Sequence, residues 1–449
     1  MENSTLNKEQ RKQKIQEIIK GIPVTTIRIQ YAGDTQELNV YDFPFSCLKF
    51  NPYNGRICSM SSEFEIENKR ELNIENDNDQ KFIRNAIWQI DEKQNEKTKE
   101  SLEKVKQLKP GVISLDGIII DGNRRASLIL KLNEENPKTE RQFRAAVLKQ
   151  DYNTDRKQIE LLETSIQIGE EEKVKYGTIE FYLKVKSMTN AGIEISQIAK
   201  SWDVKESHII ERIEVLRLME GYLIHIENEK RYRLLENTED LFLKLNSILK
   251  SYQEQKGNNP DWKPNKTQLI EYKEAMFDQI RFVYNQQKEE DGNNKFDAKK
   301  IRELFLTDGN KSILAKKDLL VEFIEKHKSK IKPKSNKFNE ENPIDKYLVS
   351  DNTNATDASK RKEHEWAKEV SNEMKNIYFY FSDKNSNSNL KDKPKVLLEK
   401  ASSIIKDIDI ESKDIIEILI DDYDENMKMA DELRKFGDDL KKILKSNYK

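Results

Sequence analysis

Four consecutive residues, Gly122, Asn123, Arg124 and Arg125, combine the groups that proteins use to bind phosphate. They follow an apolar segment and precede apolar residues at helical spacing, so we expect a strand, a turn and the start of a helix. Glycine lets the backbone approach a ligand, and the first amides of a helix favour an anion. A guanidinium adds two parallel donors that match phosphate oxygens. The residues therefore predict a phosphate site; the alternative is that the arginines only pair with nearby carboxylates.

A second segment, residues 192–219, has the spacing of a helix-turn-helix. Ile195, Ile198 and Ala199 predict the inner face of a short helix, residues 202–204 fit the turn, and the inner face of the next helix is predicted at Ile209, Ile210, Ile213 and Leu216. The side chains that we expect to face DNA are Ser196, Gln197, Lys200, Lys205, Ser207, His208 and Arg212. A plain helical hairpin remains the alternative, because phosphate contacts are opposed by three acidic residues of the second helix, Glu206, Glu211 and Glu214.

The sequence patterns around these two segments predict the strands and helices that position them, in an α+β domain followed by helices. Alternation and apolar runs predict strands in "TTIRIQY", "QELNVYDF", "LKFNPYNGRI", "GVISLDGIIID" and "QFRAAVLKQ". The first two of these strands flank Ala32–Gly33–Asp34, which indicates a β-hairpin. Residues 81–108 fit two helices, and the acidic residues 61–80 predict a surface insertion.

We expect five parts, because the length suggests several cores and the composition changes along the chain. They are an α+β domain at 1–150, a helix-turn-helix domain at 151–225, a helical domain at 226–325, a Lys/Asn-rich linker at 326–360 and a helical C-terminal domain at 361–449. The linker is inferred from its many lysines and its prolines. Heptad-like apolar spacing in the last part predicts a helical hairpin or a dimerising bundle.

Composition narrows the classes of protein. The 449 residues include 79 basic and 81 acidic side chains, so nucleic acid would have to be bound by a local patch. Two cysteines, Cys47 and Cys58, fit a reducing cytoplasm, and neither a signal peptide nor an apolar run of membrane length is found. The four histidines lack the spacing of metal ligands or of a Ser-His-Asp triad. These features predict a soluble, helix-rich cytoplasmic protein.

Four short segments between residues 48 and 223 resemble the ParB/sulfiredoxin-like superfamily. "DGNRRASLI" resembles its Gly-x-Arg-Arg motif, and "NPYNGR" resembles its Asn-Pro-x-x-x-Arg segment. Lys109–Pro110 lies where the family has Gln-Pro, and "LLETSIQIGEEE" resembles the helix that carries Glu-Asn-x-Gln-Arg. A helix-turn-helix follows this helix in ParB proteins, as it does in the present sequence.

The resemblance implies a nucleoside triphosphate that switches the grip on double-stranded DNA, with slow hydrolysis as the reset and a homodimer as the assembly. CTP is the family expectation, and Lys109 in place of glutamine leaves ATP open. The residues implied in nucleotide binding are Arg56, Lys109, Pro110, Gly122, Asn123, Arg124, Arg125 and Gln167. Mg²⁺ is implied beside Glu163 and Thr164, although the Thr164–Ser165 pair is a weaker ligand set than the family's acid and amide. Asp121 and Glu163 are the candidate catalytic carboxylates.

Two other functions remain open. One is an enzyme of the same superfamily, a nuclease or a nucleotide-dependent kinase, whose metal chemistry would use Asp121 and Glu163. Sulfiredoxin activity is not expected, because Asn123 stands where sulfiredoxins have a cysteine. The other is an interaction or regulatory subunit of a DNA-modification or phage-defence system, with a protein partner bound through the C-terminal half. The acidic second helix of the helix-turn-helix favours this last function.

Overall fold

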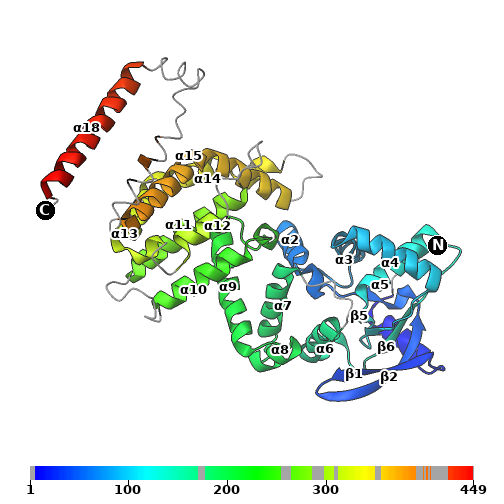
Figure 1. Cartoon of the computed structure of the whole chain (residues 1–449). Helices are drawn as coiled ribbons and strands as arrows, with labels where there is room; N and C mark the ends of the chain where they lie inside the picture. Colours follow the sequence, from blue (N-terminus) through cyan, green and yellow to red (C-terminus); the bar gives the residue numbers. More distant parts are fainter. Residues whose placement is uncertain are drawn as a thin grey trace. The chain divides into compact units, whose positions relative to one another are not determined.

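The structure is a computed structural model that describes residues 6–169, 177–253, 264–285, 298–307, 312–348, 355–390 and 423–447, with short pieces at 398, 401–402 and 405. The chain divides into two compact units, Met1–Phe381 and Ser382–Lys449 (Figure 1). The first unit holds both segments singled out in the sequence. Each unit is described by itself.

One mixed sheet lies at the centre of the N-terminal part, which confirms the α+β class. Its strands are β1 (Thr25–Tyr31), β2 (Asp34–Phe43), β3 (Lys49–Phe50), β4 (Gly111–Ile113), β5 (Ile118–Asp121) and β6 (Phe143–Val147). Their order in space is β1-β2-β6-β4-β5-β3, in which β4 and β6, and β3 and β5, run parallel and the other neighbours antiparallel. Ala32 and Gly33 have φ of 54° and 88°, the left-handed pair that a two-residue hairpin turn requires.

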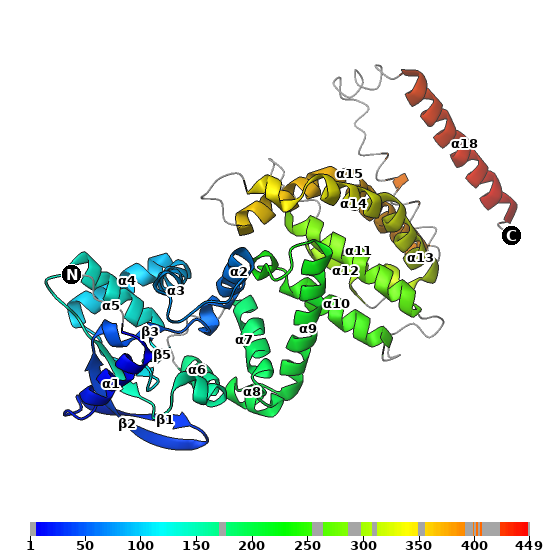
Figure 2. The same cartoon turned by 180° about the vertical axis from the view of Figure 1, so that it is seen from behind.

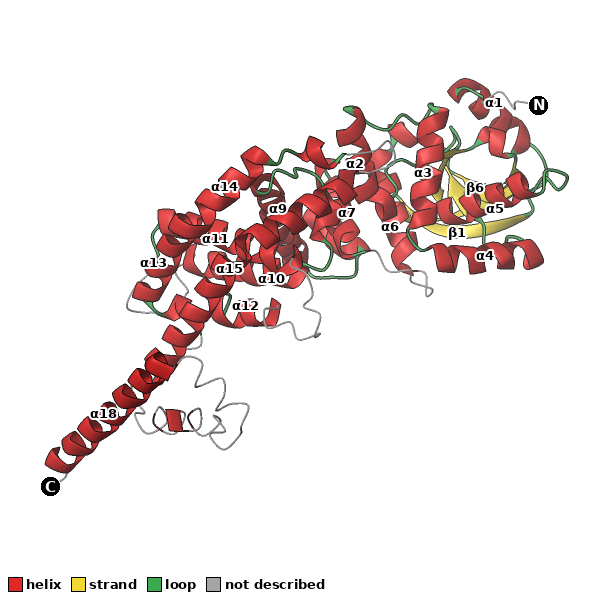
Figure 3. Cartoon of the chain, turned by 90° about the horizontal axis from the view of Figure 1, so that it is seen from above, coloured by secondary structure: helices red, strands yellow, loops and turns green. Residues whose placement is uncertain are grey.

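Helices cover both faces of the sheet (Figures 2 and 3). They are α1 (Lys8–Ile18), α2 (Cys58–Asn68), α3 (Asp77–Gln89), α4 (Glu92–Val105), α5 (Asn123–Glu135) and α6 (Arg156–Gly169). Side chains alternate across β4 and β5, so Val112, Ile118 and Ile120 pack with α6, whereas Ile113 and Ile119 pack with α1, α3, α4 and α5. Both faces of the sheet at β4 and β5 are therefore apolar and covered by helices. This packing fixes the position of the turn between β5 and α5.

The rest of the first unit is helical and shares one large core. The helices are α7 (Thr178–Asn190), α8 (Ile195–Ser201), α9 (Glu206–His225), α10 (Glu239–Gln253), α11 (Lys266–Asn285), α12 (Ala298–Phe305), α13 (Lys317–Lys326), α14 (Lys332–Glu341) and, as far as Phe381, α15 (Ala355–Leu390). A short 3₁₀ segment, η4 (Tyr232–Leu235), joins α9 to α10. The core runs from Ile179 to Phe381 in sequence, and α9, α10, α12 and α13 contact α11 (Figure 1).

The expected linker at 326–360 is corrected by the structure, because most of its described residues are helical. A π-helical turn (His327–Ile331) leads directly into α14. His327, Ile331 and Phe338 are buried, while the lysines reach outward and pair with acids of α11 and α15. High lysine content thus marks the solvent face of a packed helix.

Two further expectations need adjustment. The acidic segment 61–80 is an integral part of the fold, since α2 and α3 bury Phe64 and Asp79 there. The heptad-like tail lies largely outside the described residues; its described helix, α18 (Tyr423–Asn447), exposes apolar side chains that include Met427, Leu433, Phe436 and Ile443. None of the helices within the described ranges has both the length and the apolarity that crossing a membrane requires.

Candidate functional site

The predicted strand–turn–helix corner is present where β5 meets α5. Gly122 adopts φ of 92°, and a Cβ added there would lie 2.9 Å from Cζ of Phe143, so the position favours glycine on both counts. No side chain caps the first turn of α5. The amides of Asn123 and its neighbours therefore begin a helix end without a side-chain acceptor, an arrangement that suits an anion.

Both arginines of the corner are held by protein groups. Arg125 donates from Nη2 to Asp121 Oδ2 at 2.9 Å and to the Pro110 carbonyl at 3.3 Å, while its buried Nε has no hydrogen-bond partner. Arg124 donates from Nε to Asn95 Oδ1 at 2.6 Å and from Nη2 to Thr98. One part of the alternative weighed from the sequence, an arginine paired with a nearby carboxylate, is thus present at Arg125 and Asp121.

The corner also contacts the Asn-Pro loop, residues 51–57, which ends in the 3₁₀ segment η2 (Gly55–Ile57). The amide of Asn51 donates to Asn123 Oδ1 at 3.1 Å, and Asn123 Nδ2 donates to the Ile119 carbonyl at 2.8 Å. The amide of Gly55 donates to Glu163 Oε1 at 3.3 Å. Three of the segments that carry the family resemblance therefore meet at one place in the fold.

The remaining residues that were predicted to bind the nucleotide differ in solvent exposure. Arg56 is half-buried, and its Nε is a buried nitrogen without a hydrogen-bond partner. Lys109 is exposed, and its carbonyl accepts from Nε2 of Gln107, a nearly buried amide that the sequence reasoning missed. Gln167 belongs to α6, but its side chain lies outside the described part of the structure.

Glu163, beside which Mg²⁺ was expected, is paired with a lysine. Glu163 is almost fully buried, and Lys184 Nζ of α7 donates to its Oε2 at 2.8 Å and lies 3.8 Å from Glu160 Oε2. Burial raises the pKa of Glu163, an effect that Lys184 opposes only in part. Burial alone would lower the pKa of Lys184, but the two carboxylates outweigh it and the pKa is raised. The ammonium thus supplies the positive charge that the carboxylates require.

The other proposed metal ligand is also occupied. The Thr164 hydroxyl donates to the Glu160 carbonyl one turn back in α6, at 2.9 Å. Within the described ranges, no group of three or more His, Cys, Asp and Glu side chains could hold a metal ion. Asp121 and Glu163, the candidate catalytic carboxylates, each face a basic side chain, Arg125 and Lys184 respectively.

The helix-turn-helix is present as α8, a turn and α9. Asp203 makes the turn with φ of 52°, and Ile198 and Ala199 pack against Ile209. One expectation is wrong: Ile210, placed on the inner face from its spacing, is 40% exposed. Among the residues expected to face DNA, the exposed ones are Ser196, Gln197, Lys200, Lys205 and Ser207.

The other two residues expected to face DNA are less accessible. His208 is half-buried, and its ring lies 6.2 Å from that of Phe181. Arg212 is turned inward and donates to the Tyr182 hydroxyl at 3.2 Å. Helix α10 lies beside α9, where Lys250 pairs with Glu214 at 2.9 Å and a polar groove separates the two helices. The polar side chains in the first turn of α9 therefore line this groove, and α10 forms its other wall.

The geometry brings the corner, the Asn-Pro loop and helix α6 together, and it leaves the helix-turn-helix on a separate surface of α8 and α9. Gln107 and Lys184 complete this region, and neither was found from the sequence. No protein-family model, curated protein or solved structure matches this chain.

Proposed function

We propose that this chain is a ParB-like DNA-binding protein whose Gly122–Arg125 corner binds a nucleoside triphosphate, with CTP expected, that changes its interaction with DNA or with a partner. One observation carries the proposal. The Asn-Pro loop hydrogen-bonds both to the corner, through Asn51 and Asn123, and to α6, through Gly55 and Glu163. A ligand at the corner would therefore be sensed by the helix that leads toward the helix-turn-helix.

The corner offers three kinds of group to a phosphate. They are the backbone amides of the uncapped first turn of α5, the guanidinium of Arg125, and Gly122, whose lack of a side chain lets a ligand approach the backbone. Arg125 would exchange the Asp121 carboxylate for phosphate oxygens, which its fork of donors matches equally well. Mg²⁺ would be bound through phosphate oxygens and water, because Glu163 already faces Lys184.

Calorimetric titration of CTP, ATP and GTP with Mg²⁺ tests the nucleotide site. We expect saturable binding of one nucleotide by the wild-type protein, and a loss of at least about tenfold in Arg125→Ala, about 1.4 kcal/mol. Arg28→Ala is the matched control, since Arg28 is exposed on β1 and has no pairing group within the described residues. Absence of nucleotide binding to the folded wild type, or equal loss in both variants, contradicts the proposal.

Binding to DNA is expected to depend on Lys200 and Lys205, the exposed cations of α8 and of the residue before α9. Each phosphate contact releases a counterion, so log K should fall with log [salt]. We expect Lys200→Ala with Lys205→Ala to reduce this slope by roughly one to two units in filter binding or gel shift. Lys104→Ala on α4 is the matched control, and an unchanged slope in the double variant would refute the assignment.

An interaction subunit is the second candidate, and one observation favours it. The exposed acids Glu206 and Glu211 flank the polar groups of α9, and Arg212 is turned toward Tyr182. Because these acids would repel DNA phosphates, the surface would instead bind a basic protein partner. Homodimerisation through the exposed apolar side chains of α18 belongs to the leading proposal as well. The wild-type gel shift at low salt separates the two candidates, because only the first requires DNA binding.

A further inference from the structure

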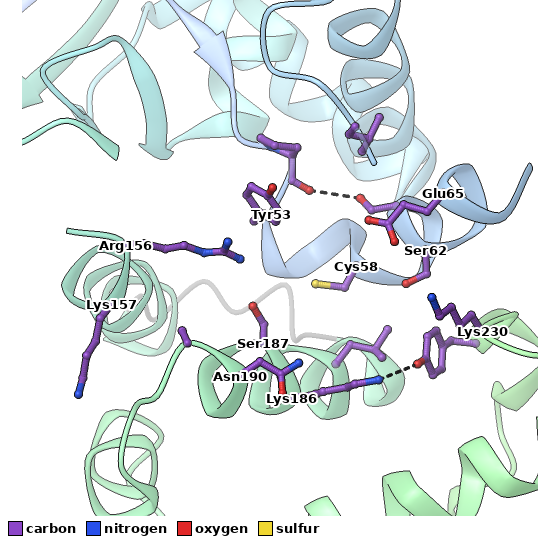
Figure 4. Close-up of a pocket in the computed structure, with 16 residues that line it drawn as sticks. Tyr53, Cys58, Ser62, Glu65, Arg156, Lys157, Lys186, Ser187, Asn190 and Lys230 are labelled. Atoms are coloured by element: carbon purple, nitrogen blue, oxygen red, sulfur yellow. Dashed lines mark hydrogen bonds between the residues drawn. The ribbon is translucent and has the colours of Figure 1, made fainter. Parts of the chain in front are cut away.

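A cavity of about 440 Å³ lies between α2, the start of α6, α7 and the segment that leads to η4 (Figure 4). None of the corner residues Asp121 to Arg125 lines it. It is therefore a different site from the one proposed for the nucleoside triphosphate. Its volume falls within the range of small-molecule sites in proteins.

Arg156 supplies the strongest anion-binding group of this cavity. Its guanidinium lies 4.2 Å from the ring centre of Tyr53 and donates from Nε to Glu160 at 3.0 Å. The two terminal nitrogens make no hydrogen bond within the described ranges, and Figure 4 shows the side chain reaching from α6 toward the open space. The ring of Tyr53 and the carboxylate of Glu160 thus fix the plane of a guanidinium whose outer edge is available for a ligand.

A second cation lies on the opposite side. Lys230 is exposed and adopts φ of 61°, and its carbonyl accepts the amide of Tyr232 at 2.9 Å. Its ammonium has neither a hydrogen bond nor an ion pair in the part of the chain that the structure describes. Figure 4 shows Lys230 near Ser62, on the α2 side of the cavity.

The remaining lining favours an anion with hydrogen-bond acceptors. Ser62 and Asn190 provide neutral donors, whereas the Ser187 hydroxyl already donates to Glu160 Oε2 at 3.2 Å. Lys186 contributes a cation that already pairs with Glu220. Glu65 is the acidic residue among those that line the cavity; burial raises its pKa, and Lys230 opposes that rise. Lys157 points away from the cavity and donates to the Gly192 carbonyl at 3.0 Å. The cations that remain, Arg156, Lys186 and Lys230, outnumber Glu65 in the lining.

We propose that this cavity binds a small phosphorylated molecule, with a phosphate group at the Arg156 fork and the Lys230 ammonium as a second cation on the other side of the cavity. The planar fork matches the oxygens of a phosphate, and a second cation across the cavity favours a ligand with more than one negative charge, such as a diphosphate. Serine and asparagine would bind the remaining oxygens or a sugar hydroxyl. The proposal stands independently of the nucleotide site at the corner.

Titration of the full-length protein with inorganic pyrophosphate, followed by calorimetry, tests the proposal. We expect saturable binding that Lys230→Gln weakens at least tenfold and that Asn190→Asp, which brings a like charge to the cavity, weakens further. Both positions are exposed, and circular dichroism should show that both variants remain folded. Lys104→Gln, which removes the same charge from α4, should bind as the wild type does.

Four outcomes would overturn it. They are absence of saturable binding, equal weakening by Lys230→Gln and Lys104→Gln, binding that is lost in Arg125→Ala and kept in Lys230→Gln, and equally tight, Lys230-dependent binding of malonate. The third outcome would move pyrophosphate to the corner, and the fourth would change the ligand from a phosphate to a carboxylate. Because CTP binding is tested by Arg125→Ala and pyrophosphate binding by Lys230→Gln, the failure of one proposal is separate from the failure of the other.

Discussion

Replacing Lys184 with methionine should lower the free energy of unfolding by about 3–5 kcal/mol, because it leaves the buried Glu163 without its cation, while Glu160 keeps Arg156. Lys184, Glu160 and Glu163 are each at most 1% exposed. Lys184 Nζ lies 2.8 Å from Glu163 Oε2, and the same carboxylate accepts the amide of Gly55 in the Asn-Pro loop. The loss should therefore loosen the contact between α6, α7 and this loop, and urea unfolding followed by circular dichroism measures it.

The deficit of the Lys184→Met variant should shrink as the pH falls from 8 to 5. Burial already raises the pKa of Glu163 above its ordinary value, and without the ammonium the pKa will rise further. A carboxyl whose pKa is higher in the folded state gains stability from protonation, so acid favours the folded variant. Adding Glu163→Gln to the variant should recover part of the loss at pH 8, whereas Lys104→Met should change nothing. A deficit below about 1 kcal/mol, or one independent of pH, contradicts the pairing.

The sequence predicted local geometry well, because local geometry depends on neighbours in the chain. The hairpin at Ala32–Gly33 and the turn at Gly122 follow from residues that adopt left-handed φ. The Asp121–Arg125 pair follows from a spacing of four residues around the start of a helix. The helix-turn-helix follows from apolar spacing, with the exception of Ile210, whose position at the solvent boundary depends on how closely α8 approaches α9.

The partners across the fold could not be predicted in the same way. Lys184 is 21 residues from Glu163, and only the packing of α7 on α6 brings the two together. A signal exists in the sequence, since a lysine between Leu183 and Val185 within an apolar helix is unusual and points to a buried partner. It does not say which acid is the partner, because α6 alone offers two, Glu160 and Glu163. Lys184 is therefore the partner of Glu163 that the sequence did not reveal, and Mg²⁺ beside Glu163 stays a prediction.

The segment 326–341 shows why composition misled where spacing would not have. Its lysines suggested a solvated linker, yet His327, Ile331, Ser335 and Phe338 recur at helical intervals and are buried. Lys328 and Lys332 pair with Glu271 and Glu274 on α11. Charged residues on the exposed face of a helix do not show whether the opposite face is apolar. It is the apolar face that determines whether the helix packs.

Replacing Arg281 with methionine should also cost about 3–5 kcal/mol, because Glu363 would then be a buried charge without a cation. Arg281 and Glu363 are each 1% exposed, and Arg281 Nη2 donates to Glu363 Oε1 at 3.2 Å. The guanidinium lies 4.0 Å from the ring centre of Trp366, so a cation–π contact is lost together with the ion pair. Asn228, which donates to Glu363 at 3.0 Å, cannot neutralise the charge.

A double-mutant cycle separates the ion pair from simple loss of packing. Glu363→Gln combined with Arg281→Met removes both charges, so its deficit should be smaller than the sum of the two single deficits by at least about 1 kcal/mol. The loss should appear in the main unfolding transition, because Glu363 and Trp366 of α15 pack on α11 within the unit that ends at Phe381. Additive deficits would mean that the charges do not interact. A separate early transition of α15 would mean that residues 355–381 fold with the C-terminal part, so the cycle also decides where the first unit ends.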